Sequence, residues 1–147
     1  MGIIAVVLSL LLVAYEVRQS NRIAQATTTY EIGRDVNQFN ELGYSDPEFA
    51  ALLVNLRDPE FRPSKVEAMQ VRLLANRFVN LWTIQEKAYR NGLLSDAQFD
   101  MTEGDVVTVM GAFPALIEYW GYVLRDAPRL AEYVVLKPIV TSVSTND

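Results

Sequence analysis

The chain opens with an apolar run that nothing else in it resembles. Residues Gly2–Tyr15 read GIIAVVLSLLLVAY, and Ser9 is the one clearly polar side chain among them. As a helix this run reaches about 21 Å, whereas the hydrocarbon core of a bilayer is about 30 Å thick and usually takes about 20 residues. The run therefore predicts a membrane-anchoring segment over residues 1–17, with a length that is marginal for a full span.

The apolar run is also compatible with three alternatives to an anchor. A cleaved signal peptide would account for its length, but no basic residue precedes it and no small-x-small cleavage site follows it. A buried helix of a soluble protein is the second, and a true start site upstream of Met1 is the third. We expect an uncleaved anchor, because a short span can thin the bilayer, let Arg18 snorkel or be covered by neighbouring subunits.

The charges beside the apolar run predict its orientation. Glu16, Arg18 and Arg22 follow Tyr15, an aromatic residue of the kind that prefers the bilayer interface, and no charged residue precedes the run. By the positive-inside rule, the two arginines predict that the C-terminal part of the chain is cytoplasmic. Contact with anionic lipid headgroups and a simple solvated helix face account for these arginines equally well.

A juxtamembrane helix over residues 18–44 is expected next. No glycine or proline interrupts Ile3–Gly33, so the anchor should run directly into this helix. Thr27–Thr29 lower the helix propensity and leave room for a local break, and Gly43 is typical of a helix stop. The apolar positions expected on this helix are Ile23, Ala26 and Tyr30.

Residues 45–141 predict a small antiparallel helical bundle. Asp46 ahead of Pro47 is typical of a helix start, and a short helix should cover Glu48–Leu56. Two capping-box spacings, Ser64 with Glu67 and Ser95 with Gln98, start two further helices. The first of these should end at Asn91-Gly92, and its apolar stripe comprises Val66, Met69, Leu73, Leu74, Phe78, Leu81, Trp82, Ala88 and Tyr89.

The last third of the chain gives weaker signals. Val106–Val109 favours a strand, but we expect a helix there because no second convincing strand is available to pair with it. Pro114 can start another helix, and the apolar piece Leu130–Val140 should be a helix that frays. Residues 142–147 are predicted to be a disordered tail. The fold class expected for the whole chain is all-α, an N-terminal anchoring helix that continues into the bundle.

The composition removes most catalytic chemistry. The chain has no cysteine and no histidine, so thiolate and imidazole nucleophiles, bases and metal ligands are excluded. Its net charge of −5 disfavours nucleic acid as a partner. Glu86 and Glu118 could meet inside the fold, but a solvated helix face or an ion pair with Arg90 or Arg72 accounts for them better. We therefore expect no enzyme activity and no catalytic, cofactor-binding or metal-binding residues.

Three groups of residues could bind a partner, and each also has a plain structural explanation. The aromatic cluster Tyr119, Trp120 and Tyr122 could face a partner or the membrane surface, but core packing is favoured. A polar groove on the central helix could receive an anionic ligand, although a hydrated edge is favoured; its residues are Arg72, Asn76, Arg77 and Asn80. Ala5 and Ser9 have the spacing of small residues that lets membrane helices pack closely.

Two motifs carry a resemblance to a known family. They are Tyr15-Glu-Val-Arg-Gln-Ser-Asn-Arg22 after the apolar run, and Trp82 with Tyr89-Arg-Asn-Gly-Leu-Leu-Ser95 further along. Together they resemble a widespread bacterial family of uncharacterised proteins with one N-terminal transmembrane helix, an E-x-R-Q juxtamembrane motif and a small helical domain. The resemblance implies a single-pass protein of the bacterial inner membrane, and it implies no activity. The apolar run here is shorter than that family's span.

Two functions follow as expectations. The first is a non-enzymatic, membrane-tethered interaction module that self-associates or serves as an accessory subunit of a membrane complex, with membrane lipid and itself or other membrane subunits as partners. The alternative is a membrane-anchored sensor that binds a small apolar or anionic molecule. A buried pocket lined by Trp82 and Tyr89 would favour the sensor, while an exposed apolar stripe on the domain would favour assembly.

Overall fold

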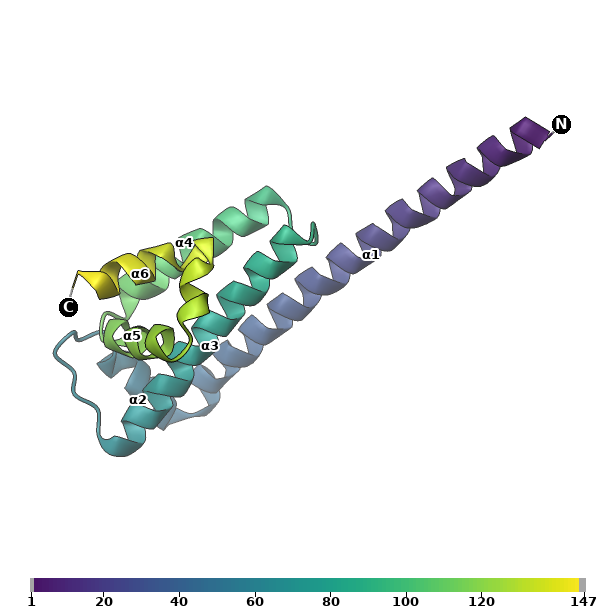
Figure 1. The fold of residues 1–147 in the computed structure, drawn as a ribbon. Helices are drawn as coiled ribbons and strands as arrows, with labels where there is room; N and C mark the ends of the chain where they lie inside the picture. The colour runs from purple at the N-terminus through teal and green to yellow at the C-terminus, as the bar shows by residue number, and fades with distance from the viewer. Residues whose placement is uncertain (1, 146–147) are drawn as a thin grey trace.

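The computed structural model describes residues 2–145, and these form six α-helices, two short 3-10 helices and no strand. The all-α prediction is confirmed. Figure 1 shows the first helix as a long rod, one half of which projects from a cluster of the others. The elements are α1 (Gly2–Ser45), α2 (Pro47–Asn55), α3 (Lys65–Arg90), α4 (Asp96–Ala112), α5 (Leu116–Asp126), η1 (Pro128–Glu132), η2 (Val134–Leu136) and α6 (Lys137–Ser144).

Helix α1 passes through both of its weak points without interruption. Thr27–Thr29 stay helical, so the local break does not occur. The prediction of a stop at Gly43 is wrong, because α1 continues to Ser45. At about 1.5 Å per residue, its 44 residues make a rod about 66 Å long. One rigid element therefore reaches from the apolar run to the far end of the helical cluster.

Side-chain caps begin three helices where the sequence predicts them. The Asp46 carboxylate accepts hydrogen bonds from the amides of Glu48 and Phe49 at 2.9 and 3.1 Å, which begins α2. The remaining two starts are capping boxes in which side chain and backbone bond reciprocally, as the spacing predicts. Those boxes join Ser64 to Glu67 at the start of α3 and Ser95 to Gln98 at the start of α4.

The turn from α3 to α4 is closed by a glycine in the left-handed region. Gly92 has a φ of 71°, and its amide donates to the carbonyl of Tyr89 at 2.8 Å. The amide of Leu93 donates to the carbonyl of Ala88 at 2.8 Å, which completes a Schellman motif. Since only five residues separate the two helices, α4 turns back along α3 (Figure 1). The stacked rings of Tyr89 and Phe99, 4.3 Å apart, hold the pair together.

Helix α3 lies at the centre of the core, but its buried face differs in part from the predicted stripe. Leu74, Phe78, Trp82 and Ala88 are buried as predicted. The other end of the stripe is wrong, because Val66, Met69 and Leu73 are 72, 60 and 61% exposed. Helices α5 and η2 pack against a neighbouring face of α3. The core therefore also uses α3 residues outside the stripe, namely Val71, Ala75, Val79, Thr83 and Glu86.

The C-terminal region is more ordered than its sequence suggests. The piece Leu130–Val140 forms η1, η2 and the beginning of α6, and α6 continues to Ser144. The disordered tail is therefore wrong for residues 142–145, while residues 146–147 lie outside the described part. Val143 packs against the core, and a Cβ atom at Gly121 would lie only 3.3 Å from its Cγ1. The bare backbone of α5 thus lets α6 pack closely against it.

A buried carboxylate joins α3 to the C-terminal region. Glu86 is 1% exposed, and its two oxygens accept hydrogen bonds from the amides of Val134 at 3.2 Å and Val135 at 2.9 Å. It also forms the predicted ion pair with Arg90, whereas the predicted solvated helix face is wrong. These bonds satisfy the first amides of η2, which is otherwise without a side-chain cap.

Replacing Glu86 should therefore destabilise the domain. We expect Glu86→Ala to lower the free energy of unfolding by about 2 kcal/mol, because the buried amide of Val135 and the partly buried amide of Val134 lose their acceptor. Urea denaturation followed by circular dichroism measures this. Glu118→Ala is the matched control, since Glu118 is exposed and should cost under about 0.5 kcal/mol. Equal losses for the two variants would contradict the role assigned to Glu86.

The α3 capping box should also make stability depend on pH. Hydrogen bonds from the side chain and the backbone of Ser64 hold the pKa of Glu67 below its ordinary value of 4.5. The stabilisation is therefore complete above that value and is lost as the pH falls through the lowered pKa. We expect Glu67→Gln to flatten the acid limb of a plot of stability against pH below about pH 4.5. An unchanged acid limb would show that the box contributes nothing.

Candidate functional site

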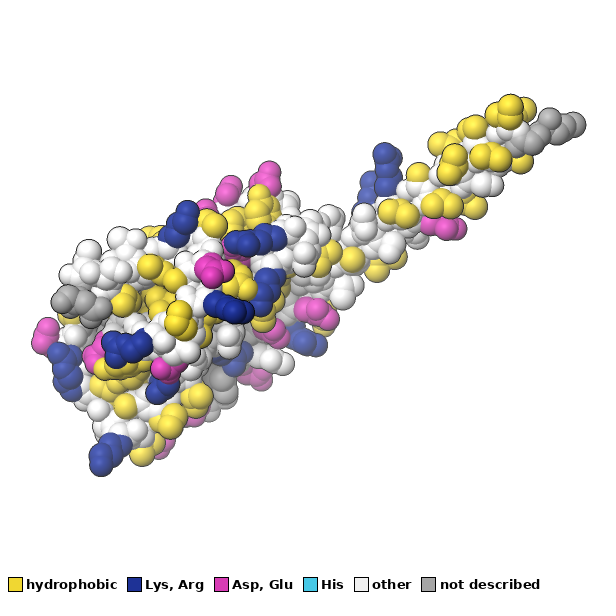
Figure 2. Space-filling view, in the orientation of Figure 1, with side chains coloured by type: hydrophobic (Ala, Val, Ile, Leu, Met, Phe, Trp, Pro, Cys, Tyr) yellow, Lys and Arg dark blue, Asp and Glu magenta, His cyan; other side chains and the backbone are white. Residues whose placement is uncertain are grey.

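The outer half of α1 is apolar and uncovered. Figure 2 shows hydrophobic side chains along the projecting rod, with charged side chains only nearer the domain. Ile3 is 83% exposed, and large side chains from Ile4 to Val17 are between 49 and 69% exposed. Helix α1 contains the single stretch in residues 2–145 that is long and apolar enough to cross a membrane, and none of that stretch is buried. The domain folds without using it.

The inner half of α1 lies against the domain through one narrow face. Ala24, Thr28, Ile32 and Phe39 are half-buried along this face. Ile23 and Tyr30, expected on the apolar side of the helix, are 59 and 71% exposed and point away from the domain. Two hydrogen bonds fasten the near end of this face, from the Gln25 amide to the Gly92 carbonyl at 3.0 Å and from the Gln98 amide to the Thr29 hydroxyl at 3.2 Å.

An aromatic contact fastens the far end of α1. The Phe39 ring meets the rings of Phe49 and Phe78 edge-on, at centroid distances of 6.0 and 5.3 Å. The guanidinium of Arg77 lies 5.5 Å above the Phe39 ring and donates to the carbonyl of Asp35 at 3.2 Å. Arg77 therefore takes part in the contact between α1 and the domain. The sequence had suggested a different role for it, in a groove that binds an anionic ligand.

A groove of ≈ 640 Å³, here called the α1–α4 groove, lies between α1 and α4 with α3 beneath. Apolar side chains from all three helices line it, among them Ile32, Leu81 and Met101. A buried pocket lined by Trp82 and Tyr89 would favour the sensor, but neither residue lines this groove. Trp82 is fully buried, and its indole NH donates to the Asp105 carboxylate at the groove wall at 2.8 Å. This groove was not predicted from the sequence.

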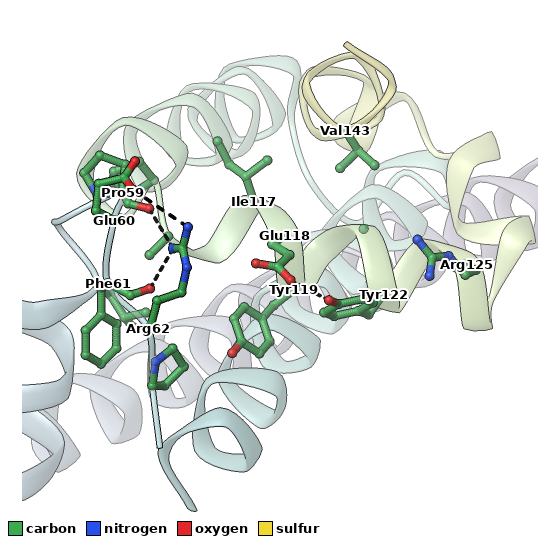
Figure 3. Close-up of a pocket in the computed structure, with 15 residues that line it drawn as sticks. Pro59, Glu60, Phe61, Arg62, Ile117, Glu118, Tyr119, Tyr122, Arg125 and Val143 are labelled. Carbon is green, nitrogen blue, oxygen red and sulfur yellow. Dashed lines mark hydrogen bonds and ion pairs between the residues drawn. The ribbon is translucent and has the colours of Figure 1, made fainter. Parts of the chain in front are cut away.

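A second cavity, of ≈ 830 Å³, opens between the proline-rich loop before α3 and helices α5 and α6. In Figure 3 Tyr119 and Tyr122 line it from α5, with Arg62 across from them on the loop. Arg62 is engaged by its own loop, donating to the carbonyl of Phe61 at 3.1 Å. The hydrogen bond to the Glu118 carboxylate raises the pKa of the Tyr122 hydroxyl, and burial raises that of Tyr119. Both tyrosines therefore stay protonated at neutral pH.

The other groups of residues that the sequence suggested as binding sites do not come together into one site. Trp120 is fully buried, so core packing is confirmed for that member of the aromatic cluster. Arg72 pairs with Asp126 at the end of α5, on a different side of α3 from Arg77, so the polar groove does not form. Glu118 bonds Tyr122 and does not meet Glu86.

Within residues 2–145, no group of three or more acidic side chains could hold a metal ion. No family model, curated protein or solved structure matches this chain. The resemblance stated from its two motifs therefore stays a prediction. The structure places the first motif on the exposed part of α1, and the second in the last turns of α3 and its turn to α4.

The contact of α1 with the domain should depend on Phe39. In Phe39→Ala, we expect backbone amides of residues 28–43 to exchange hydrogen about tenfold faster, because a helix segment without tertiary packing is marginal in water. Hydrogen exchange with mass spectrometry measures this, and amides of α3 should change much less. Gln38→Ala is the matched control, since Gln38 is an exposed residue next to Phe39 on the same helix. Similar acceleration in both variants would contradict the assignment.

Proposed function

We propose that this chain is a non-enzymatic, membrane-tethered helical interaction module, held on the cytoplasmic face of a bacterial inner membrane by the outer half of α1. One observation carries the proposal: an uncovered apolar helix projects from a domain that folds without it. About 25 cal/mol is gained for each Å² of such surface removed from water. An apolar rod of this length therefore favours a bilayer or a partner over solvent.

The spacing along α1 suits this arrangement. The apolar stretch ends near Val17, and the first fastening to the domain is at Gln25. Eight helical residues separate them by about 12 Å, enough to cross the headgroup layer, which is about 5 to 8 Å thick on each side. Glu16, Arg18 and Arg22 then lie at headgroup level and the domain lies just outside it.

Features of the domain support an interaction role over catalysis. Val66, Met69 and Leu73 form an exposed apolar stripe along the first half of α3, the feature that favours assembly. Two carboxylates line the cavity beside α5, but Glu60 pairs with Arg62 and Glu118 accepts a hydrogen bond from Tyr122. Neither tyrosine of that cavity has a lowered pKa. A short anchor also gains from neighbouring helices that cover it.

Charges placed in the outer half of α1 should release the protein from membranes. We expect Leu8→Arg with Leu11→Arg to move most of the protein from the membrane to the soluble fraction, because each central arginine costs about 2.5 to 3.5 kcal/mol. Fractionation after an alkaline wash, with immunoblotting, measures this. Val54→Arg with Val107→Arg is the matched control, since both residues are exposed and lie on the domain. A wild-type chain found in the soluble fraction would overturn the proposal.

A second candidate function is a sensor, and the α1–α4 groove is the observation that favours it. Its volume suits a small ligand, its lining is mostly apolar, and α1 forms one wall. We expect the purified chain to bind an apolar fluorescent probe, and Leu81→Glu to weaken binding about tenfold through charge placed in the groove. Ile84→Glu is the control, because Ile84 is exposed on the same helix and does not line the groove. Equal binding by both variants would remove this candidate.

A further inference from the structure

The face of α1 that points away from the domain has a regular pattern. Seven residues recur at steps of 4, 3, 4, 4, 3 and 4, an eleven-residue repeat that keeps them on one side of a nearly straight helix. At about 100° per residue they fall in an arc about 80° wide. We call them the outer stripe: Leu8, Leu12, Tyr15, Gln19, Ile23, Ala26 and Tyr30.

The outer stripe lies on the side of α1 opposite the domain. The half-buried residues that contact the domain, such as Ala24, Thr28 and Ile32, fall in an arc centred roughly 180° away. A second helix could therefore pack on the outer stripe without displacing the residues of α1 that contact the domain. After Tyr30 the same helical positions are taken by Arg34, Asn37 and Glu41. The stripe thus ends, and covers about 33 Å of helix.

Part of the outer stripe lies where lipid cannot cover it. Ile23, Ala26 and Tyr30 follow the headgroup-level charges, beside the domain, and Ile23 and Tyr30 are 59 and 71% exposed. Lipid tails can cover Leu8 and Leu12 on every side, but these later residues face water unless protein covers them. Continuity of the stripe across the interface therefore points to a helix that runs alongside α1 both within the membrane and outside it.

The charges beside the stripe suit a second copy of α1 as that helix. Glu16 and Arg22 flank the stripe on opposite sides, each about 60° from its centre, and among residues 2–145 neither has an ion-pair partner. In a parallel two-fold pair, each flank of one helix faces the other flank of its partner. The offset of six residues is about 9 Å along the axis, which a glutamate and an arginine side chain span together.

Resting on the proposed function, we propose that the chain forms a parallel homodimer through the outer stripe of α1. Ile23, Ala26 and Tyr30 pack across the two-fold axis outside the membrane, and Leu8 and Leu12 do so within it. Glu16 of each chain pairs with Arg22 of the other, and these two reciprocal pairs close the interface at headgroup level. Gln19 meets its own copy on the axis, where a single polar residue favours one register.

The absence of cysteine makes the test direct. Single substitutions Ile23→Cys, Ala26→Cys and Asn21→Cys are made in the full chain, and membranes from expressing cells are treated with a mild thiol oxidant. Asn21 is the matched control, because it is exposed on α1 two residues from Ile23 but on the opposite face. We expect disulfide-linked dimers from Ile23→Cys and Ala26→Cys, at least about fivefold more than from Asn21→Cys.

The outcomes separate this inference from the proposed function. Equal cross-linking at all three positions, or none in protein that stays in the membrane fraction, would overturn the dimer and leave the membrane module standing. Disulfides from the outer stripe to a protein of another mass would also overturn it, in favour of a different partner. Protein absent from the membrane fraction would overturn the proposed function first.

A charge exchange tests the pairing of Glu16 with Arg22. In the Ile23→Cys chain, Glu16→Arg places two positive charges together and should lower the dimer yield about fivefold. Adding Arg22→Glu should restore the yield, because the two signs are then exchanged. Glu31→Arg makes the same charge change about 120° from the stripe centre and should leave the yield unchanged. Failure of the double exchange to restore the yield would overturn the reciprocal pairing.

Discussion

A row of four aromatic rings ties the long helix to the core, and the arrangement of the molecule depends on it. Phe39 on α1 meets Phe78, which stacks on Trp82 at 5.3 Å, and Trp82 lies 5.9 Å from Trp120 on α5. Such pairs favour defined angles as well as burial, so they orient the elements that carry them. The row sets the direction in which α1 leaves the domain and the width of the α1–α4 groove.

Local chemistry is the reason that the helix boundaries could be predicted. A capping residue acts on amides two or three positions away, so Asp46, Ser64 and Ser95 identify their helices without any knowledge of the fold. Gly92 ends α3 for a similarly local reason. The membrane-anchoring segment could also be predicted, because the composition of the apolar run alone distinguishes it from the rest of the chain. The main part of the candidate site, the projecting half of α1, was thus visible from the sequence.

Long-range contacts are the reason that the rest could not be predicted. Glu86 lies inside a helix like any surface glutamate, and its burial depends on η2, some 48 residues along the chain. Leu73 fits an apolar stripe, yet only the packing of α5 and η2 decides which face of α3 becomes core. The α1–α4 groove follows from how three helices diverge, a property that no single segment encodes.

Because α1 is uninterrupted, the apolar segment and the domain are held in a fixed relative orientation about one helix axis. Between Val17 and Gln25 there is neither a proline nor a glycine at which the two ends could swivel independently. Insertion of one residue there would rotate the domain by about 100° about the helix axis and lift it by about 1.5 Å. The length of this connector therefore sets which side of the domain faces a neighbour in the membrane plane, and natural variants should change it in steps close to whole helical turns.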